Sequence, residues 1–347
     1  MIRKVVLTVC FISVLLVKAQ SDNSYTIPKE SDIRALLEQN KVPGVAIGLI
    51  NNGAIKNFVT IGKSHINDAI TKKTIFDVAS LTKTVTTELV LQLTTKGKWD
   101  LDEPLYKYWV DPDIKNDPHH KLLTTRHVLR HSTGFKNWRW MNEDNKLQFD
   151  FEPGTKFQYS GEGFEYLRKA LENKFETTFQ KLVDENVFAP NNMNNSSLVW
   201  DANIANLNFA GTHDKEGEPY TYEKSISSNA ADNLLTSVEE FSQLGVHTLK
   251  EINKGNSIYQ EMITKHSEVR PGIDFGLGWI IFKDLPNDEY ALFNAGSDKG
   301  VNALIVLLPK SKNGLVILTN GDGGRALAMN LVSIILGDLG SAMLSRF

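Results

Sequence analysis

The residues whose types and spacing could do chemistry are Ser80 and Lys83, which form the one Ser-x-x-Lys motif in the sequence. Residues 84–96 follow with the apolar spacing of a helix. If that helix begins near Ser80, positions i and i+3 share a face and the amine lies beside the hydroxyl. A serine hydroxyl is a weak nucleophile until a neighbouring group activates it. The spacing alone favours a plainer interpretation, a helix N-cap followed by a solvated lysine.

Two groups of strand-like segments flank this motif. Residues 45–50 and 58–62 enclose Asn51-Asn52-Gly53, which is a strong hairpin signal. The strands of the second group are joined by short turns, whereas parallel strands would need long crossover connections. We therefore expect one antiparallel sheet of five or six strands that contains both groups. The second group comprises residues 278–282, 290–293, 302–308 and 315–318.

Helices are expected at both ends of this sheet and through the middle of the chain. Residues 31–39 and 324–336 have helical periodicity, and residues 237–250 open with a Ser-x-x-Glu capping box. Strands at both ends and helices between them predict an α+β fold. The expected parts are an α/β lobe of about residues 24–78 plus 275–347 and an inserted, mainly helical lobe of about residues 79–274.

Residues 1–19 differ in character from the rest of the chain. Arg3 and Lys4 precede an apolar run, residues 5–17, and small or apolar side chains follow, a pattern typical of a secretory signal peptide. The run is too short for a transmembrane helix, and no other run approaches the necessary length. We expect residues 20–347 to be the mature domain, exported to the periplasm or the medium, with no membrane span.

Composition narrows the classes of partner. The formal net charge is −3 and no basic stripe is visible, which argues against nucleic acid. Cys10 is the single cysteine and lies in the predicted signal peptide, so the mature chain would lack a thiol for disulfides, catalysis or metal binding. We expect a small molecule or a peptide as the partner and no cofactor. Composition does not predict an oligomeric state.

Two histidines offer an alternative chemistry. His127 and His131 are four residues apart, which is the spacing of two zinc ligands on one helix face. Val128 stands where a metalloprotease helix carries glutamate, and no third ligand is nearby. Structural histidines are therefore the favoured interpretation, and no metal is predicted.

A serine hydrolase of the α/β-hydrolase type is not predicted, because the sequence has no Gly-x-Ser-x-Gly elbow. Five stretches in order instead resemble motifs of the serine beta-lactamase and penicillin-binding-protein superfamily. The similar branch contains class C beta-lactamases, D-alanyl-D-alanine carboxypeptidases and related esterases. The resemblance spans roughly residues 30–340 and implies the beta-lactamase/transpeptidase-like fold. The five stretches are residues 76–83, 129–135, 153–160, 233–240 and 275–279.

This resemblance implies roles for individual residues. Ser80 would be the nucleophile that becomes acylated, and Lys83 would hold the proton network around it. Tyr159 would act with Lys83 as general base and later as acid. The backbone N–H groups of Ser80 and Ser297 would hold the oxyanion, and Gly296 would leave room for substrate along the strand. The resemblance also makes His131 part of the scaffold.

Two departures from the superfamily pattern bear on the substrate. Gly161 stands where relatives have an asparagine that contacts the catalytic lysine and the substrate amide. Asn294 replaces the lysine or histidine of the third motif and cannot supply a positive charge for a substrate carboxylate. Lys299 and Arg325 are candidates to replace that charge, although a surface lysine and an ordinary helix-start arginine are the favoured interpretations.

We therefore expect a serine hydrolase that acts through an acyl-enzyme on an ester or amide, of esterase or D-amino-acid peptidase type. Penicillins and D-Ala-D-Ala peptides present a carboxylate, so the departures predict weak or no beta-lactamase activity. The alternative is a non-catalytic protein that binds peptides or cell-wall fragments on the same fold. Retention of Ser80, Lys83 and Tyr159 together favours the enzyme.

Overall fold

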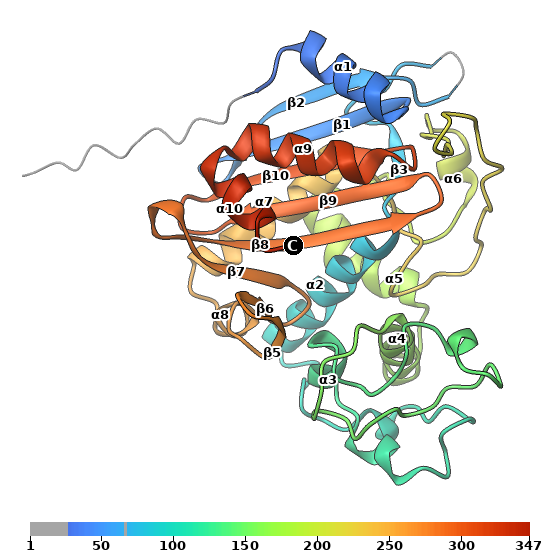
Figure 1. Cartoon of the computed structure of the whole chain (residues 1–347). Helices are drawn as coiled ribbons and strands as arrows, with labels where there is room; N and C mark the ends of the chain where they lie inside the picture. Colours follow the sequence, from blue (N-terminus) through green and yellow to red (C-terminus); the bar gives the residue numbers. More distant parts are fainter. Residues whose placement is uncertain (1–26, 66–67) are drawn as a thin grey trace, which may run out of the picture.

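The computed structural model describes residues 27–65 and 68–347, so the predicted signal peptide lies outside the described residues. Within the described part, eight strands form one sheet in the order β2-β1-β10-β9-β8-β7-β6-β5, and each neighbouring pair is antiparallel (Figure 1). The strands are β1 (Gly44–Asn51), β2 (Ala54–Gly62), β5 (Ser267–Arg270), β6 (Ile273–Phe275), β7 (Ile280–Leu285), β8 (Glu289–Asp298), β9 (Val301–Leu308) and β10 (Asn313–Thr319).

Both ends of the described chain contribute to this sheet, as predicted. The first hairpin pairs with the last strand, with Val45 opposite Thr319. The expected five or six strands were too few, because β5 and β6 extend the sheet. These two strands are only a few residues long and β5 is largely exposed, so they carry little of the apolar alternation that identifies a strand. A separate pair, β3 (Ile75–Asp77) with β4 (Leu235–Ser237), lies beside the sheet.

Helices cover the two faces of the sheet (Figure 1). The strand β9 is buried along its whole length. Its residues alternate between the two cores, with Leu304 and Val306 packed toward one helical layer and Ile305 and Leu307 toward the other. A strand covered on both faces is apolar throughout, which explains the uninterrupted run in the sequence. One layer consists of α1 (Glu30–Asn40), α9 (Gly324–Leu336) and α10 (Asp338–Leu344); the other contains α2 (Thr82–Thr95) and α7 (Val238–Asn253).

The middle of the chain is a lobe of short helices and loops beside the second layer (Figure 1). Its helices are α3 (Thr125–Leu129), α4 (Gly161–Phe175), α5 (Phe179–Val183), α6 (Ala202–Ala205) and α8 (Ser257–Met262). At the start of α7, the Ser237 side chain caps the helix by accepting from the Glu240 N–H. The Glu240 carboxylate accepts instead from Asn195 and Ser196, so the return half of the predicted capping box is used for a tertiary contact. The predicted α+β class is confirmed.

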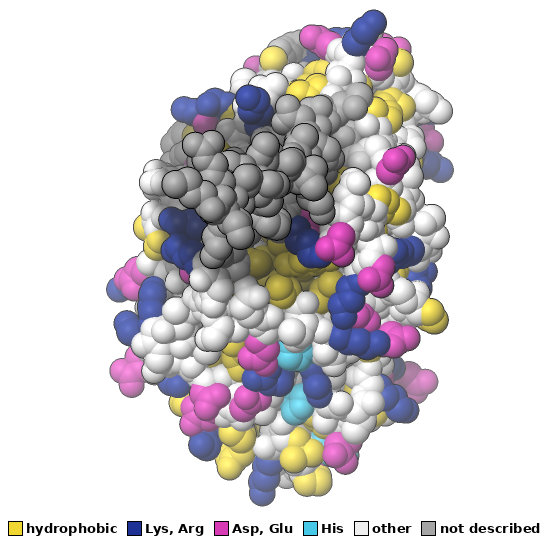
Figure 2. Space-filling model, turned by 90° about the vertical axis from the view of Figure 1, so that its left-hand side faces the viewer, with side chains coloured by type: hydrophobic (Ala, Val, Ile, Leu, Met, Phe, Trp, Pro, Cys, Tyr) yellow, Lys and Arg dark blue, Asp and Glu magenta, His cyan; other side chains and the backbone are white. Residues whose placement is uncertain are grey.

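The surface is mixed in charge. On the face in Figure 2, Lys and Arg side chains are interspersed with Asp and Glu outside the grey region. In the part of the chain that the structure describes, no helix has the length and apolar character needed to cross a membrane.

Candidate active site

Ser80 lies in a single 3-10 turn, η1 (Ala79–Leu81), between β3 and α2. The Lys83 ammonium, one helical turn further on, donates to Ser80 Oγ at 3.0 Å. Lys83 is almost fully buried, with 2% of its surface exposed, and its second bond goes to the Ala231 carbonyl at 2.9 Å. A buried amine is kept in a protein only where its donors are used. The solvated-lysine interpretation is therefore wrong, because tertiary packing closes over a residue that spacing alone left at the surface.

Tyr159 flanks the lysine. The Lys83 Nζ lies 4.8 Å from the centre of the Tyr159 ring and 5.8 Å from that of Phe164. Tyr159 itself is 37% exposed, so its phenol borders both the buried amine and the solvent. The structure thus brings Tyr159, which is far from Ser80 and Lys83 in sequence, into one cluster with them.

His131 supports Tyr159. Its ring lies 4.3 Å from the Tyr159 ring, and its Nδ1 accepts from the Ser160 N–H at 3.1 Å. Burial and the neighbouring Lys83 hold the pKa of His131 well below its usual value, so the ring is neutral and can accept. The His131 backbone carbonyl also accepts from the Gln158 N–H at 2.7 Å. The histidine therefore fixes the backbone on both sides of Tyr159, a positional role.

The strand β8 forms the wall beside Ser80. A Cβ on Gly296 would lie 2.9 Å from the Ser80 backbone nitrogen and would overlap the Val78 carbonyl oxygen. Only glycine allows the strand to approach the nucleophile this closely. In the β8–β9 hairpin, Ser297 pairs with Asn302 one step from the closing pair Asp298–Val301. Because antiparallel ladders alternate, the Ser297 N–H points away from β9 and toward the free edge beside Ser80.

The two departures from the superfamily pattern have structural causes. Gly161 begins α4, and a Cβ there would lie 2.8 Å from the Trp138 ring. The indole occupies the space that an asparagine side chain would need. Asn294 donates through its amide to the Gly278 carbonyl at 2.7 Å and is 9% exposed. Its side chain holds a loop and leaves no charge on the wall.

The two candidates for a replacement charge lie on opposite sides of β8. Lys299 follows the strand and lines a cavity of about 660 Å³ beside Asp77 and Asp298. Arg325, at the start of α9, lines a smaller cavity of about 210 Å³ on the helix-covered side of Ser297. Lys299 thus lies on the same side of β8 as Asp77, whereas Arg325 lies on the side covered by α9. The Lys299 side chain is exposed.

Acidic groups near the nucleophile were missed by the sequence analysis. Asp232 follows the carbonyl that holds Lys83, and burial together with the Asp77 carboxylate raises the pKa of Asp232 to about 7. Burial also raises the pKa of Asp77, which ends β3 three residues before Ser80. Asp77 lies inside the quoted motif, but nothing in its sequence neighbourhood indicates that a distant loop contacts it.

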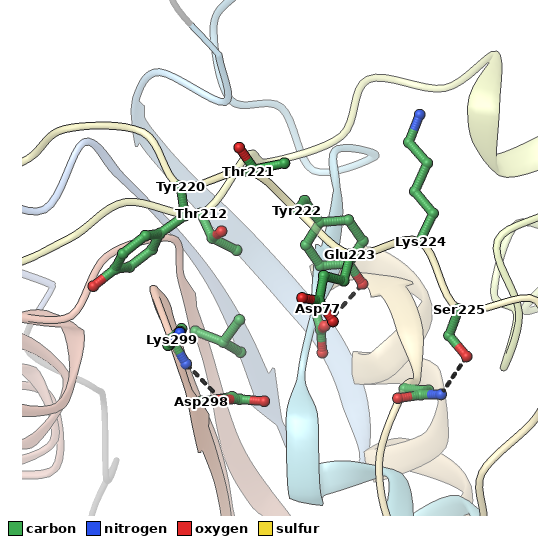
Figure 3. A pocket seen from close by; sticks show the side chains of 12 residues that line it. Asp77, Thr212, Tyr220, Thr221, Tyr222, Glu223, Lys224, Ser225, Asp298 and Lys299 are labelled. Atoms are coloured by element: carbon green, nitrogen blue, oxygen red, sulfur yellow. Dashed lines mark hydrogen bonds between the residues drawn. The ribbon is translucent and has the colours of Figure 1, made fainter.

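The large cavity opens beside the nucleophile turn (Figure 3). It is bounded by β8 on one side and by the segment of residues 220–225 on the other. The Tyr222 ring points to Asp77, whereas Lys224 extends away from the cavity and lies over Trp200. Residues 220–225 thus provide a wall of this cavity.

In the described ranges, 27–65 and 68–347, no group of three or more His, Cys, Asp or Glu side chains could hold a metal ion. His127 Nδ1 lies 3.3 Å from Thr124 Oγ1, and His131 Nδ1 is used by Ser160. In this structure both histidines thus contact protein groups of their own neighbourhood.

Known proteins resemble this chain in sequence and in fold. Protein flp from Staphylococcus aureus (strain NCTC 8325 / PS 47) is 22% identical over 316 residues, which cover 82% of this chain and 61% of that protein. The chain thus spans about three fifths of the length of this relative. The putative fimbrial assembly protein FimD, serogroup D, of Dichelobacter nodosus is 32% identical over 126 residues, 32% of each chain.

Two solved structures have the same fold. The octameric penicillin-binding protein homologue from Pyrococcus abyssi superposes with a TM-score of 0.77 at 23% identity, over 90% of this chain and 77% of that chain. The D-alanine carboxypeptidase AmpC from Burkholderia cenocepacia gives 0.72 at 19% identity, over 89% and 99%. The sequence also matches the Beta-lactamase family over residues 30–336. The chain therefore belongs to the Beta-lactamase family, and the predicted resemblance is confirmed.

Proposed function

We propose that this protein is a serine hydrolase that forms an acyl-enzyme at Ser80 with esters or amides and has little or no beta-lactamase activity. The observation that carries the proposal is the buried Lys83 ammonium, 3.0 Å from Ser80 Oγ, against the close wall of β8 at Gly296. A nucleophile, an amine and a strand edge with free N–H groups are the parts that acyl transfer requires.

The proposed first step forms a bond between Ser80 Oγ and the substrate carbonyl carbon. An ammonium at Lys83 can only donate, so the Ser80 proton leaves toward Tyr159, which accepts it as the phenolate and becomes a neutral phenol. The carbonyl oxygen becomes an oxyanion held by the N–H groups of Ser80 and Ser297. The bond to the leaving group then breaks, and the proton held by Tyr159 passes to that group. Water next attacks the acyl-enzyme, with Tyr159 as base, and releases the acid and Ser80.

The direction of β8 suggests how a substrate would lie. Tyr159 stacks on His131, and the His131 ring is 5.0 Å from Phe275, near the Asn294 end of the strand. Tyr159 must reach the leaving group, so the leaving group would lie at that end. The acyl group would then extend past Gly296 to Asp298 and into the cavity of about 660 Å³.

The chemistry of the two walls favours substrates without a carboxylate. Asn294 places no positive charge beside the leaving group, and the cavity on the acyl side presents Asp77 and Asp298. A carboxylate held near carboxylates is disfavoured by several tenths of a kcal/mol or more. Neutral acyl esters and amides are therefore the proposed substrates. The finer choice between esterase and D-amino-acid peptidase is left to the substrate screen below.

A fluorophosphonate probe tests the nucleophile. We expect stoichiometric labelling of the wild type, located at Ser80 by peptide mass spectrometry, and none in Ser80→Ala. Ser333→Ala is the matched control, because this serine lies on α9 on the other side of the sheet and should label normally. Absence of labelling in the wild type would instead support the non-catalytic binding protein.

A substrate screen tests the specificity. Acyl esters of increasing chain length should be cleaved, with tolerance for long acyl groups set by the large cavity. D-amino-acid peptides should be tested beside them, and nitrocefin should be cleaved slowly or not at all. Nitrocefin turnover at rates that match the best ester would contradict the proposed preference.

The proposed site of action is outside the cytoplasm, since residues 1–19 have the pattern of a signal peptide. Expression of the full chain in a bacterium followed by mass measurement would test this. A secreted or periplasmic product that begins near residue 20 supports export, and an intact cytoplasmic product contradicts it.

A further inference from the structure

Two tyrosines of one short segment make the same kind of contact on either side of the active site. The Tyr222 hydroxyl donates to Asp77 Oδ2 at 2.9 Å, and the Tyr220 hydroxyl donates to Asp322 Oδ2 at 2.9 Å. Both tyrosines line the large cavity, and Figure 3 shows Tyr222 directed at Asp77 and Tyr220 directed away from it.

Each aspartate also accepts a hydrogen bond from a backbone N–H through its other carboxylate oxygen. Asp77 Oδ1 accepts from the Ala79 N–H at 2.8 Å, immediately before Ser80. Asp322 Oδ1 accepts from the Gly300 N–H at 2.7 Å, in the turn that follows Ser297 by three residues. The two chains of contacts therefore end on the two backbone segments that would supply the oxyanion donors.

The first of these segments is strained. Ala79 has a φ of +45°, a left-handed conformation that a residue with a Cβ rarely adopts. Such a conformation persists only where surrounding contacts hold it. Asp77 supplies a contact at this residue, and on the opposite side Gly296 packs directly against the same turn. A shift at Ala79 would move the Ser80 N–H and Oγ together.

The segment that carries the tyrosines is itself anchored. The Tyr222 ring lies 4.6 Å from the Phe209 ring and 5.6 Å from the Trp200 ring. Near Phe209, Ala210 donates through its N–H to the Ile75 carbonyl of β3 at 2.8 Å. Burial and the nearby Asp77 carboxylate raise the pKa of Tyr222, so its hydroxyl remains a donor. The contact to Asp77 is thus presented by a fixed aromatic cluster.

We propose that Tyr222–Asp77 and Tyr220–Asp322 are pairs of positioning residues that hold the two halves of the oxyanion hole in register. This inference rests on the proposed function, because it assumes acyl transfer at Ser80. It assigns to residues 220–222 a role in the rate of the chemical step and no role as a nucleophile, base or acid.

The test compares single hydroxyl deletions. Tyr222→Phe should lower kcat roughly tenfold and Tyr220→Phe roughly threefold, since loss of a hydrogen bond to a charged group misplaces the donors without removing them. KM for the best ester should stay within about twofold, because the oxyanion forms only after substrate binds. The bimolecular rate of Ser80 phosphonylation should fall in parallel, because the small probe needs the same donors.

Tyr108→Phe is the matched control. Tyr108 also donates its hydroxyl to a carboxylate, that of Glu103, but it lies in the helical lobe away from Ser80. This variant should keep wild-type kcat and phosphonylation. Thermal unfolding of all three variants separates a loss of stability from a loss of rate at a temperature where each is folded.

The Asp77 contact can be tested by graded replacement. Asp77→Asn keeps an acceptor oxygen for the Ala79 N–H, whereas Asp77→Ala removes it, so the asparagine variant should retain several times more activity. If the alanine variant fails to fold, Tyr222→Phe decides the question alone. Wild-type rates in Tyr222→Phe would overturn the proposal for the nucleophile turn, and wild-type rates in Tyr220→Phe would overturn it for the strand. Failure of the wild type to react with the probe would instead overturn the proposed function.

Discussion

Two sets of residues around Ser80 are built differently. In the first, the nucleophile set, polar groups bond to one another: Lys83 to Ser80 and to a backbone carbonyl, and Asp77 to Ala79 and Tyr222. In the second set, Gly161 has no side chain and packs against an indole, and the Asn294 amide is used to hold a loop. Under the proposed function, the difference means that this chain has the groups needed to form an acyl-enzyme but no charge at Asn294 to hold an anionic substrate.

The largest expected effect comes from removing the Lys83 amine from the nucleophile set. Lys83→Met fills a similar volume without the charge, and we expect it to lower kcat/KM by at least about 10³-fold, as removal of one member of a catalytic unit does. The measurement is ester turnover beside fluorophosphonate labelling. Lys250→Met, at an exposed position on α7, serves as the control and should stay within a few-fold of wild type. Wild-type turnover in Lys83→Met would remove the basis for the whole comparison.

A second change tests the contact between β8 and the turn that carries Ser80. Gly296→Ala forces a Cβ against the Val78 carbonyl and the Ser80 N–H. The overlap should cost about 1–3 kcal/mol of unfolding free energy and reduce kcat roughly 10- to 100-fold, because the oxyanion donors separate. The neighbouring Ala295→Val adds bulk at an exposed position on the other face of β8 and should leave activity intact. Equal activities in the two variants would show that the strand does not need this close approach.

The third prediction concerns the second set of residues, at Gly161. Gly161→Asn alone should destabilise the protein by about 1–3 kcal/mol, because the new side chain overlaps the Trp138 ring. Trp138→Ala in the same chain should recover part of that loss, with a coupling free energy of about 0.5–3 kcal/mol in a double-mutant cycle. Denaturant unfolding of the four proteins measures it. Additive changes would mean that the indole does not exclude the asparagine.

The last prediction concerns the pH dependence that Asp232 gives to stability. Its pKa in the folded protein is about 7, against an ordinary value near 4, so between these values the folded state binds more protons than the unfolded state. The free energy of unfolding should therefore fall as pH rises from about 4 to 7, by at most about 1.4 kcal/mol per pH unit from this group.

Asp232→Asn should flatten that dependence. The stability of the variant compared with that of the wild type should therefore be higher at pH 8 than at pH 4. Unfolding curves across this range, with Asp338→Asn on the outer helix α10 as the control, would measure the difference. An identical pH dependence in Asp232→Asn and wild type would show that burial and the Asp77 carboxylate do not keep the Asp232 carboxyl group uncharged.

Much of the fold follows from local pattern. The hairpin at Asn52-Gly53 and the strands β7 to β10 were predicted from turn residues and apolar runs, and α9 was predicted with the bounds it has. The strands β5 and β6 were not, because they pair at an exposed edge where no apolar core selects their residues. Short connections predicted the antiparallel pairing within the second group of strands, whereas the pairing of β1 with β10, which fixes the order of the sheet, was not predicted.

The candidate site divides along the same line. Ser80, Lys83 and Tyr159 could be named from motifs, and their types already indicate acyl transfer. Trp138, Asp77 and Tyr222 could not, because the contacts that give them a role join segments that are distant in the chain: Trp138 packs against Gly161, and Tyr222 donates to Asp77. Contacts of this kind leave no periodic signal in a single sequence.

By itself, the sequence indicated the candidate nucleophile and its neighbouring amine and determined the absence of a charge at Asn294, because these are properties of residue type and spacing. Only the tertiary structure decided that Lys83 is buried, that an indole fills the place of the missing asparagine, and that two tyrosines reach the backbone of the oxyanion hole. The physical reason is that burial, exclusion and long-range hydrogen bonding depend on which segments meet, and those meetings are set by the packing of the whole chain.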